Sequence, residues 1–205
     1  MENKPVIITI GRQFGSGGRE IGEKLAHKLN IGYYDKALIE EAAKAHGLNQ
    51  TVVETYDEKP AGRFAFTMDV LGLGHAPKTP PDMPIGMQVA FAQFAAIREV
   101  AGRGDCVIIG RCADFVLADH PHVLHVFVHA SDEKRLERVT QRYNLSPDEA
   151  KRALRTVDKR RASYYNYYTD QSWGDMRNYH LTLDSGDLGI QGCVEMIARY
   201  LELRP

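Results

Sequence analysis

The chain has 205 residues, of which 43% are hydrophobic and 26% are charged, a composition typical of one folded domain with insertions. A formal net charge of -1 argues against a surface built for general nucleic-acid or membrane binding. Cys106, Cys112 and Cys193 lack CxxC spacing, so we expect buried free thiols, not a disulfide framework or a zinc site. We expect a cytoplasmic protein, because no segment approaches about 20 apolar residues.

Apolar runs alternate with segments of helical period along the chain, which predicts an α/β fold with a parallel sheet. We expect strands at Val6–Ile10, Ile31–Tyr34, Cys106–Ile109, Val123–Val128 and His180–Leu183. We expect helices at Gly18–Leu29, Lys36–His46, Met87–Ala101, Ser131–Tyr143, Pro147–Tyr165 and Leu188–Leu203. The sequence Ser146-Pro147-Asp148-Glu149 is a capping box with proline at the first helical position.

The segment Lys59–Gly86 interrupts this alternation, since it is crowded with Gly and Pro and shows no steady period. It is either an ordered loop or flap that serves the site, or a tolerated surface insertion. The sequence favours neither alternative.

The first predicted strand runs into a glycine-rich turn that opens an amphipathic helix. Gly15, Gly17 and Gly18 allow a tight backbone bend that turns N–H groups inward, and the helix that follows points the positive end of its dipole at the same spot. This pattern predicts a phosphate cradle. A dinucleotide fingerprint is less consistent, because Glu20 stands where the third glycine belongs, and a purely structural glycine turn is the other alternative.

The usual P-loop places Lys and then Ser or Thr at the end of its motif, but Gly18, Arg19 and Glu20 stand in that region here. Arg12 and Arg19 are the candidates to supply the missing positive charge, and we favour Arg12, since Arg19 sits in the first helical turn and is expected to point outward. Glu20 either binds Mg²⁺ or complements the helix dipole, and Ser16 is a second candidate metal ligand.

A second constellation follows the apolar run Val107–Ile109, where the sequence continues Gly110-Arg111-Cys112-Ala113-Asp114. Ligands of parallel sheets bind at such strand ends. Arg111 is placed to bind a second phosphate group, and Asp114 either orients it or accepts a hydrogen bond from a sugar or base. A surface ion pair is the alternative for these two residues.

The helices near the C-terminal third are rich in arginine. Most of these side chains are expected on solvated faces, among them the two stripes Arg135, Arg138, Arg142 and Arg152, Arg155, Lys159. Asp158 and Arg161, one turn apart, are the pair that we assign to a site. The aromatic cluster Tyr164–Tyr168 is expected to pack a helix end onto the core, in preference to stacking on a base.

Taken together, these motifs resemble the cytidylate kinase-like family, a group of nucleoside monophosphate kinase relatives. The resemblance covers nearly the whole chain and rests on four stretches: ITIGRQFGSGGREIGEKLAHKLNIGYYD, VIIGRCADFVL, DKRRASYY and YHLTLDSGDLG. It implies a three-layer P-loop kinase fold with a five-stranded parallel sheet. The implied core is about 1–35, 87–130 and 180–205, with an acceptor-binding insertion at about 36–86 and a lid at about 131–179.

The resemblance also implies roles for individual residues. ATP would be bound by Gly15, Ser16, Gly17, Gly18 and Arg19; Arg161 would close over the transferred phosphoryl group with Asp158 as its orienter; Asp35, Arg111, Asp114 and Asp184 would lie near the acceptor. Gly18 at the Lys position, Glu20 at the hydroxyl position and Cys112 after Gly110-Arg111 depart from true cytidylate kinases.

The sequence therefore predicts a phosphotransferase that uses ATP and Mg²⁺ and phosphorylates a nucleoside monophosphate, cytidylate-like, or a similar small phosphorylated acceptor. The alternative is a catalytically silent nucleotide-binding or sensing protein with a degenerate P-loop. We expect a small-molecule nucleotide as the partner, with no nucleic acid and no membrane, and homo-oligomerisation stays open.

Overall fold

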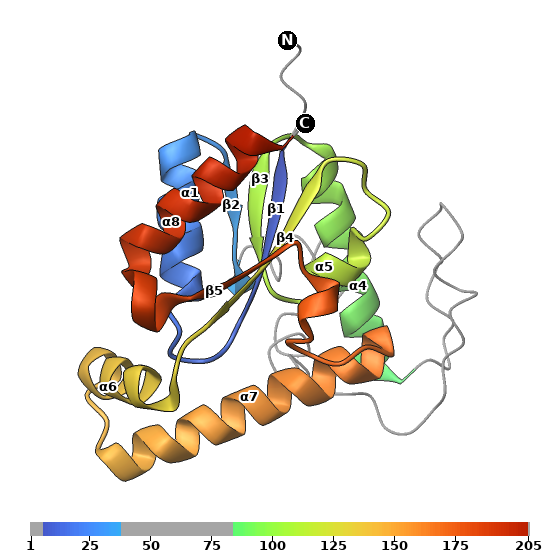
Figure 1. Ribbon diagram of the computed structural model, residues 1–205. Helices are drawn as coiled ribbons and strands as arrows, with labels where there is room; N and C mark the ends of the chain where they lie inside the picture. Colours follow the sequence, from blue (N-terminus) through green and yellow to red (C-terminus); the bar gives the residue numbers. More distant parts are fainter. Residues whose placement is uncertain (1–5, 38–83, 205) are drawn as a thin grey trace.

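The computed structural model describes residues 6–37 and 84–204, and its centre is a five-stranded parallel sheet (Figure 1). The strands are β1 (Ile7–Arg12), β2 (Gly32–Tyr34), β3 (Cys106–Ile109), β4 (Val123–His129) and β5 (Leu181–Asp184). Their order is β2-β3-β1-β4-β5, and every neighbouring pair is parallel. The central strand β1 therefore lies between β3 and β4.

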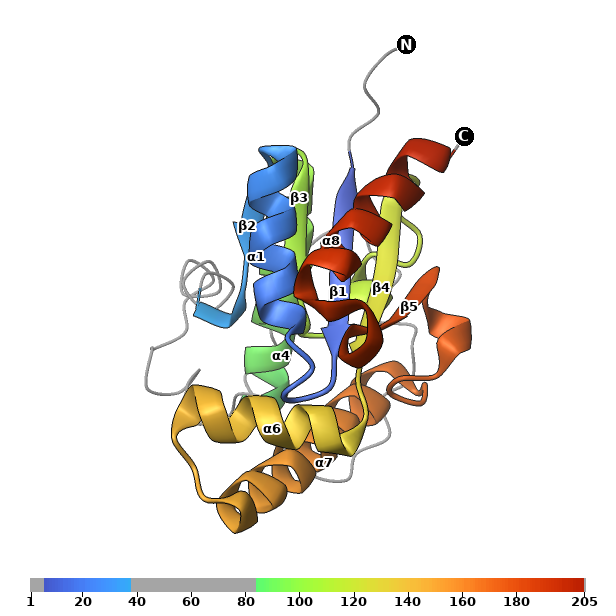
Figure 2. The same cartoon turned by 60° about the vertical axis from the view of Figure 1, so that its left-hand side comes forward.

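Alternation of side chains along β1 divides the hydrophobic core into two parts. Ile7 joins a cluster with α4 (Ile85–Gly102) and α5 (Ala113–Val116) on one face of the sheet. Ile8 and Ile10 join a second cluster with α1 (Gly18–Leu29) and α8 (Ser185–Leu203). The result is a three-layer sandwich, whose α1–α8 layer is seen in the turned view (Figure 2).

The helices α6 (Asp132–Tyr143) and α7 (Pro147–Thr169) lie beyond the carboxyl ends of the strands (Figure 1). A short 3-10 helix, η2 (Met176–Asn178), precedes β5. Serine residues cap both long helices: the Ser131 hydroxyl accepts a hydrogen bond from the Lys134 N–H, and Ser146 forms the predicted capping box with Glu149. None of the helices within residues 6–37 and 84–204 is long and apolar enough to cross a membrane.

The predicted elements are confirmed wherever the structure describes them, with shifted ends. The helix predicted at Met87–Ala101 begins at Ile85, which removes Ile85 and Gly86 from the predicted loop, and α8 begins at Ser185 with a break at Gly189. The short helices α5 and η2 were not predicted, because three or four residues carry no period. The predicted helix Lys36–His46 and the segment 59–83 lie largely or wholly outside the described residues.

The aromatic cluster extends α7 by four residues beyond the prediction, to Thr169. Tyr164 and Tyr165 are buried, and the Tyr168 ring meets Phe94 edge-on at 6.0 Å between centroids. The cluster thus packs the end of α7 against α4, as predicted. All three cysteines are buried and free, also as predicted.

Candidate active site

The turn between β1 and α1, residues 13–17, is here called the glycine-rich loop. Gly15 and Gly17 have φ of 81° and 80°, a region that favours glycine. The Ser16 hydroxyl donates to the Gln13 carbonyl at 2.9 Å, which closes the loop on itself. No side chain caps the N-terminus of α1, so its first N–H groups are left to another acceptor.

Side chains of α6 and α8 pack closely against this loop. A Cβ added to Gly15 would lie 2.9 Å from Val139 Cγ2, and one added to Gly17 would lie 2.3 Å from Ile190 Cδ1. Gly15 therefore requires glycine for reasons of space as well as conformation, whereas the neighbour of Gly17 is the movable end of a side chain and conformation is the stronger reason there. α6 on one side and α8 on the other hold the loop in its bent form.

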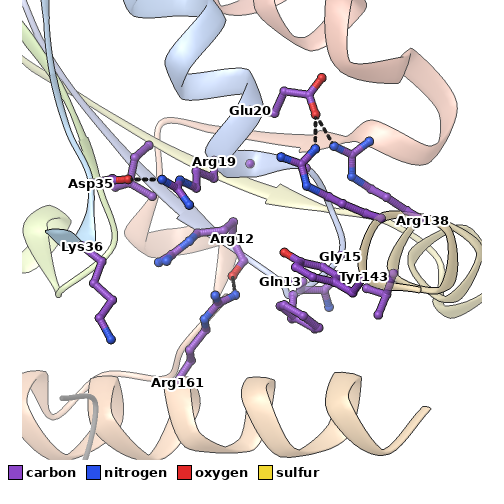
Figure 3. Close-up of a pocket in the computed structure, with 16 residues that line it drawn as sticks. Arg12, Gln13, Gly15, Arg19, Glu20, Asp35, Lys36, Arg138, Tyr143 and Arg161 are labelled. Atoms are coloured by element: carbon purple, nitrogen blue, oxygen red, sulfur yellow. Dashed lines mark hydrogen bonds and ion pairs between the residues drawn. The ribbon is translucent and has the colours of Figure 1, made fainter. Parts of the chain in front are cut away.

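A cavity of about 380 Å³ opens over the glycine-rich loop, and we call it the loop cavity (Figure 3). Two acidic side chains, Glu20 and Asp35, contribute to its wall. Six cationic side chains also line it: Arg12, Arg19, Lys36, Arg138, Arg142 and Arg161. This excess of positive charge above uncapped helix N–H groups suits a polyphosphate anion.

Arg19 and Asp35 form an ion pair at the rim of the loop cavity, with 2.5 Å between Nη2 and Oδ2 (Figure 3). The Arg19 side chain is 72% exposed, in agreement with the outward direction predicted for it. Asp35 is buried and also accepts a hydrogen bond from the Ala37 N–H, so it ties the segment after β2 to α1. Lys36, the next residue, lines the cavity.

Glu20 has different neighbours from those expected of a metal ligand. Its carboxylate pairs with Arg138, with Arg142 at 3.0 Å and with Lys24 at 3.2 Å. Burial acts to raise the pKa of Glu20, but the hydrogen bonds of Arg138 and Lys24 outweigh it, so the pKa lies below its ordinary value. Glu20 thus holds the α6 arginines at the cavity, a connection that sequence spacing does not reveal.

The described residues contain no group of three or more His, Cys, Asp or Glu side chains arranged to hold a metal ion. Ser16, the other predicted metal ligand, is buried and its hydroxyl donates to Gln13. Neither prediction is tested directly. A Mg²⁺ ion fits here only in the company of phosphate oxygens and water, which commonly supply most of its ligands.

An ion pair between α6 and α7 binds the backbone of the glycine-rich loop. Asp158 of α7 accepts a hydrogen bond from the Phe14 N–H at 2.7 Å, and Arg135 of α6 donates to the Phe14 carbonyl at 3.1 Å. Arg135 and Asp158 are themselves 2.5 Å apart, and Arg135 is buried. The pair fixes the Phe14 peptide from both sides, so Arg135 does not lie on the solvated face predicted for it.

Arg161, one turn after Asp158, donates to the Arg12 carbonyl at 3.1 Å (Figure 3). Its guanidinium carbon lies 5.9 Å from the centre of the Phe14 ring, a cation–π contact. Asp158 was predicted to orient Arg161, and that role stays a prediction. Arg152, Arg155 and Lys159 are exposed, as predicted.

A second, much smaller cavity of about 20 Å³ lies at the end of β3, and we call it the strand-end cavity. It holds about one water molecule. Its lining is Gly11, Arg12, Gly110, Arg111, Cys112, Asp114, Arg161, Tyr164, Tyr165, Trp173 and Tyr179. The two cavities share Arg12 and Arg161.

Three successive residues at the strand-end cavity have left-handed backbone: Gly110, Arg111 and Cys112, with φ of 72°, 58° and 56°. The two residues other than glycine cost about 1–2 kcal/mol each in this conformation. Such strain is concentrated at functional sites. The turn buries the Arg111 side chain at the strand end, so the alternative of a surface ion pair is wrong.

Asp114 is a buried carboxyl group in the same cavity, and the Tyr165 hydroxyl donates to it at 2.8 Å. Burial raises the pKa of Asp114 above its ordinary value, although the hydrogen bonds of Tyr165 and Tyr179 act in the opposite direction. Burial likewise raises the pKa of both tyrosines. The structure thus brings Arg111 and Asp114 together in one buried cluster with two tyrosines.

Asp184, also predicted to lie near an acceptor, ends β5 and caps α8 by accepting a hydrogen bond from the Gly186 N–H at 2.8 Å. It lines neither of the two cavities described above. Lys36 and the pairing of Glu20 with Arg138 were missed by sequence reasoning. The first follows directly after Asp35 and was detectable as a neighbour, whereas the second joins residues 118 positions apart.

A model of the cytidylate kinase-like family matches residues 7–187. A cytidylate kinase of Methanopyrus kandleri is 27% identical over 189 residues, which cover 88% of this chain and 84% of the relative. A solved structure of an uncharacterized protein from Eubacterium ventriosum is 28% identical, with a TM-score of 0.74 and coverage of 97% of this chain and 99% of the other.

More distant structures share the fold alone. A shikimate kinase from Bacteroides thetaiotaomicron has 17% identity and a TM-score of 0.56, with 97% of this chain and 99% of the other covered. A gluconokinase from Sinorhizobium meliloti has 16% identity and a TM-score of 0.51, with 98% of each chain covered. The sheet order and this likeness confirm the predicted P-loop kinase fold. The chain belongs to the cytidylate kinase-like family.

Proposed function

We propose that the protein is a phosphotransferase that moves the γ-phosphoryl group of ATP to a nucleoside monophosphate, cytidylate-like, or to a similar small phosphorylated acceptor. The observation that carries the proposal is the arrangement of the loop cavity and the strand-end cavity, which meet at Arg12 and Arg161. Two sites that share a pair of guanidinium groups suit a transfer between two phosphates, because phosphoryl transfer depends mainly on positioning and charge stabilisation.

In this proposal the loop cavity takes the donor. Backbone N–H groups of the glycine-rich loop and of the first turn of α1 hold its phosphates, and Arg138 and Arg142 from α6 add positive charge. The family relationship and the cation-rich wall support ATP as the donor. Mg²⁺ neutralises charge on the phosphates when it is bound with the nucleotide.

The strand-end cavity takes the acceptor phosphate, with Arg111 as the residue that binds it. The present volume of about 20 Å³ is too small for a phosphate group. The acceptor must therefore displace side chains, and Arg161 is placed at the boundary where such a movement would also bring charge to the transferred group. Asp114 and its tyrosines then line the acceptor side.

The experiment that tests this proposal is ADP formation with ATP and Mg²⁺ against a panel of nucleoside monophosphates. We expect acceptor-dependent turnover in the wild type and its loss in Arg161→Ala. The matched control is Arg160→Ala, the neighbouring exposed arginine of α7, which lines neither of the two cavities. Nucleotide binding without turnover over the whole panel would favour the alternative function, a nucleotide-binding or sensing protein that has lost catalysis.

A further inference from the structure

We propose that Arg12 takes the place of the missing P-loop lysine by entering from the end of β1, through a channel that Gly18 and Gly110 keep open, and that it contacts the donor and acceptor phosphates together. The inference rests on the proposed function. It assigns Gly18 and Gly110 as positioning residues for Arg12. It also explains why the lysine position of the motif is a glycine.

The first observation is the contact between Arg12 and Gly18. A Cβ added to Gly18 would lie 2.6 Å from Arg12 Cβ and 3.0 Å from Arg12 Cγ. These atoms belong to the first part of the side chain, which cannot swing away as a long flexible end can. A lysine at position 18 and an arginine at position 12 therefore exclude each other.

The second observation lies at the other end of the Arg12 side chain. A Cβ added to Gly110 would lie 1.9 Å from Arg12 Nη1 and 3.0 Å from Arg12 Cζ. The guanidinium group thus rests directly on the backbone of Gly110, one residue before Arg111. Arg12 begins against the first turn of α1 and ends against the carboxyl end of β3.

This course carries the charge to the boundary between the loop cavity and the strand-end cavity, both of which Arg12 lines. Figure 3 shows its side chain in the centre of the loop cavity, above Arg161, which binds the Arg12 carbonyl. A guanidinium group has a planar set of five N–H donors, whereas an ammonium group is a single point charge. One arginine can therefore bind oxygens of two phosphate groups, as a transfer between them requires.

The steric half of the inference is tested without any ligand, by the change in Tm that Gly18→Ala causes in the wild type and in the Arg12→Gly variant. We expect Gly18→Ala to lower the Tm by about 5 °C in the wild type, because the added methyl group meets Arg12 Cβ. In the Arg12→Gly variant the same substitution should lower the Tm much less, because Arg12 Cβ is no longer present. Gly102→Ala is the control, since nothing lies within 4 Å of its added Cβ. An equal penalty in both backgrounds would overturn the steric claim.

The charge half is tested by titration with ATP, with and without Mg²⁺. We expect Arg12→Gly and Arg12→Met each to raise the Kd for ATP by about 10- to 100-fold. This is the loss of affinity that corresponds to one charge-assisted hydrogen bond. Adding Gly18→Lys should restore binding in the Arg12→Gly protein, where the space is vacant. It should not do so in the Arg12→Met protein, which keeps the blocking stem. Recovery in both proteins or in neither would contradict a shared space, and wild-type affinity in the single variants would overturn the role of Arg12.

The outcomes separate this inference from the proposed function. A wild type that binds ATP but phosphorylates no acceptor leaves the proposed function refuted, while the pattern of ATP affinities still supports or overturns the inference. If the wild type phosphorylates an acceptor and the Arg12 variants match it in turnover and in affinity for ATP, the inference is overturned and the proposed function stands. Absence of ATP binding in the wild type would overturn both.

Discussion

The glycine-rich loop and the end of β3 are both strand ends of one sheet, but they are built in opposite ways. The loop carries an open cavity of about 380 Å³, walled by backbone and by six cationic side chains. The β3 end has about 20 Å³ of space around buried Arg111 and Asp114. The loop side is open to a polyphosphate as it stands, whereas the β3 side must rearrange to admit a ligand.

The way each region is held differs as well. Side chains from α6 and α7 bind the backbone of the loop, with Asp158 and Arg135 on the two sides of the Phe14 peptide. The β3 end is held by its own strained turn and by tyrosine hydroxyl groups on a buried carboxyl group. The helix α7 therefore contacts both regions, through Asp158 at the loop and through Tyr165 at the β3 end.

The largest expected effect lies on the β3 side. Arg111→Ala should lower acceptor-dependent kcat by about 100-fold or more, because it removes a charged donor from the acceptor phosphate. The KM for ATP should change little, since the loop cavity does not include Arg111.

The control for Arg111→Ala is Arg98→Ala, an exposed arginine of α4. Because Arg111 is buried, Arg111→Lys provides a second variant with a charged, similarly long side chain. Circular dichroism would establish that each variant is folded. Turnover like the wild type in folded Arg111→Ala would refute the assignment of the acceptor side.

The next effect tests the attachment of α6 and α7 to the loop. Asp158→Asn should lower the free energy of unfolding by about 1–2 kcal/mol, because buried Arg135 then keeps an ion pair only with exposed Asp132. The Kd for ATP should rise together with this loss, since asparagine has one acceptor oxygen and cannot accept from both Arg135 and the Phe14 N–H as the carboxylate does. Urea unfolding and ATP titration measure the two quantities, with Asp148→Asn on the exposed first turn of α7 as control. A stability loss with unchanged ATP affinity would restrict Asp158 to the fold.

A smaller effect distinguishes the two regions by pH. The pKa of Asp114 is raised on folding, so its contribution to stability is greatest below its ordinary value of 3.8 and is lost as the pH rises toward the folded pKa. Asp114→Asn removes this dependence, so the wild type should lose more stability than the variant between pH 4 and pH 7. Unfolding in urea at the two pH values measures this difference in stability. The control is Asp119→Asn, an exposed position, which should lose as much stability as the wild type between the two pH values. Identical pH dependence in wild type and Asp114→Asn would show that the buried carboxyl group titrates normally.

The smallest effect concerns Glu20. Glu20→Gln should change stability by less than about 1 kcal/mol, because its ion pairs are partly exposed. The Mg²⁺ concentration for half-maximal ADP formation should stay unchanged, since the Glu20 carboxylate is ion-paired with Arg138 and Arg142 and does not bind the metal in this account. A titration with Mg²⁺ checks this against Glu23→Gln, an exposed residue of α1. A raised Mg²⁺ requirement in Glu20→Gln alone would restore the metal-ligand role.

The difference between the two regions also explains what the sequence could predict. Local patterns identified the strands, the long helices, the glycine-rich turn and Arg111, because each depends on a few neighbouring residues. The pairing of Glu20 with Arg138 and the bond from the Phe14 N–H to Asp158 were not predictable, since each joins residues more than 100 positions apart. Arg161 was assigned to a site from the sequence, and it lines both cavities, but its contact with the Arg12 carbonyl depends on how α7 lies across the strand ends. The acceptor-binding insertion predicted at about 36–86 falls largely outside the described residues.

The most direct test of a transfer between the two cavities is to follow the label from ATP radioactive at its γ-phosphate, in the presence of Mg²⁺ and nucleoside monophosphates such as CMP. The account predicts that the label appears on a nucleoside diphosphate, and that the amount falls sharply in Arg111→Ala. Release of the label only as inorganic phosphate, or its retention in bound ATP with every acceptor, would contradict it.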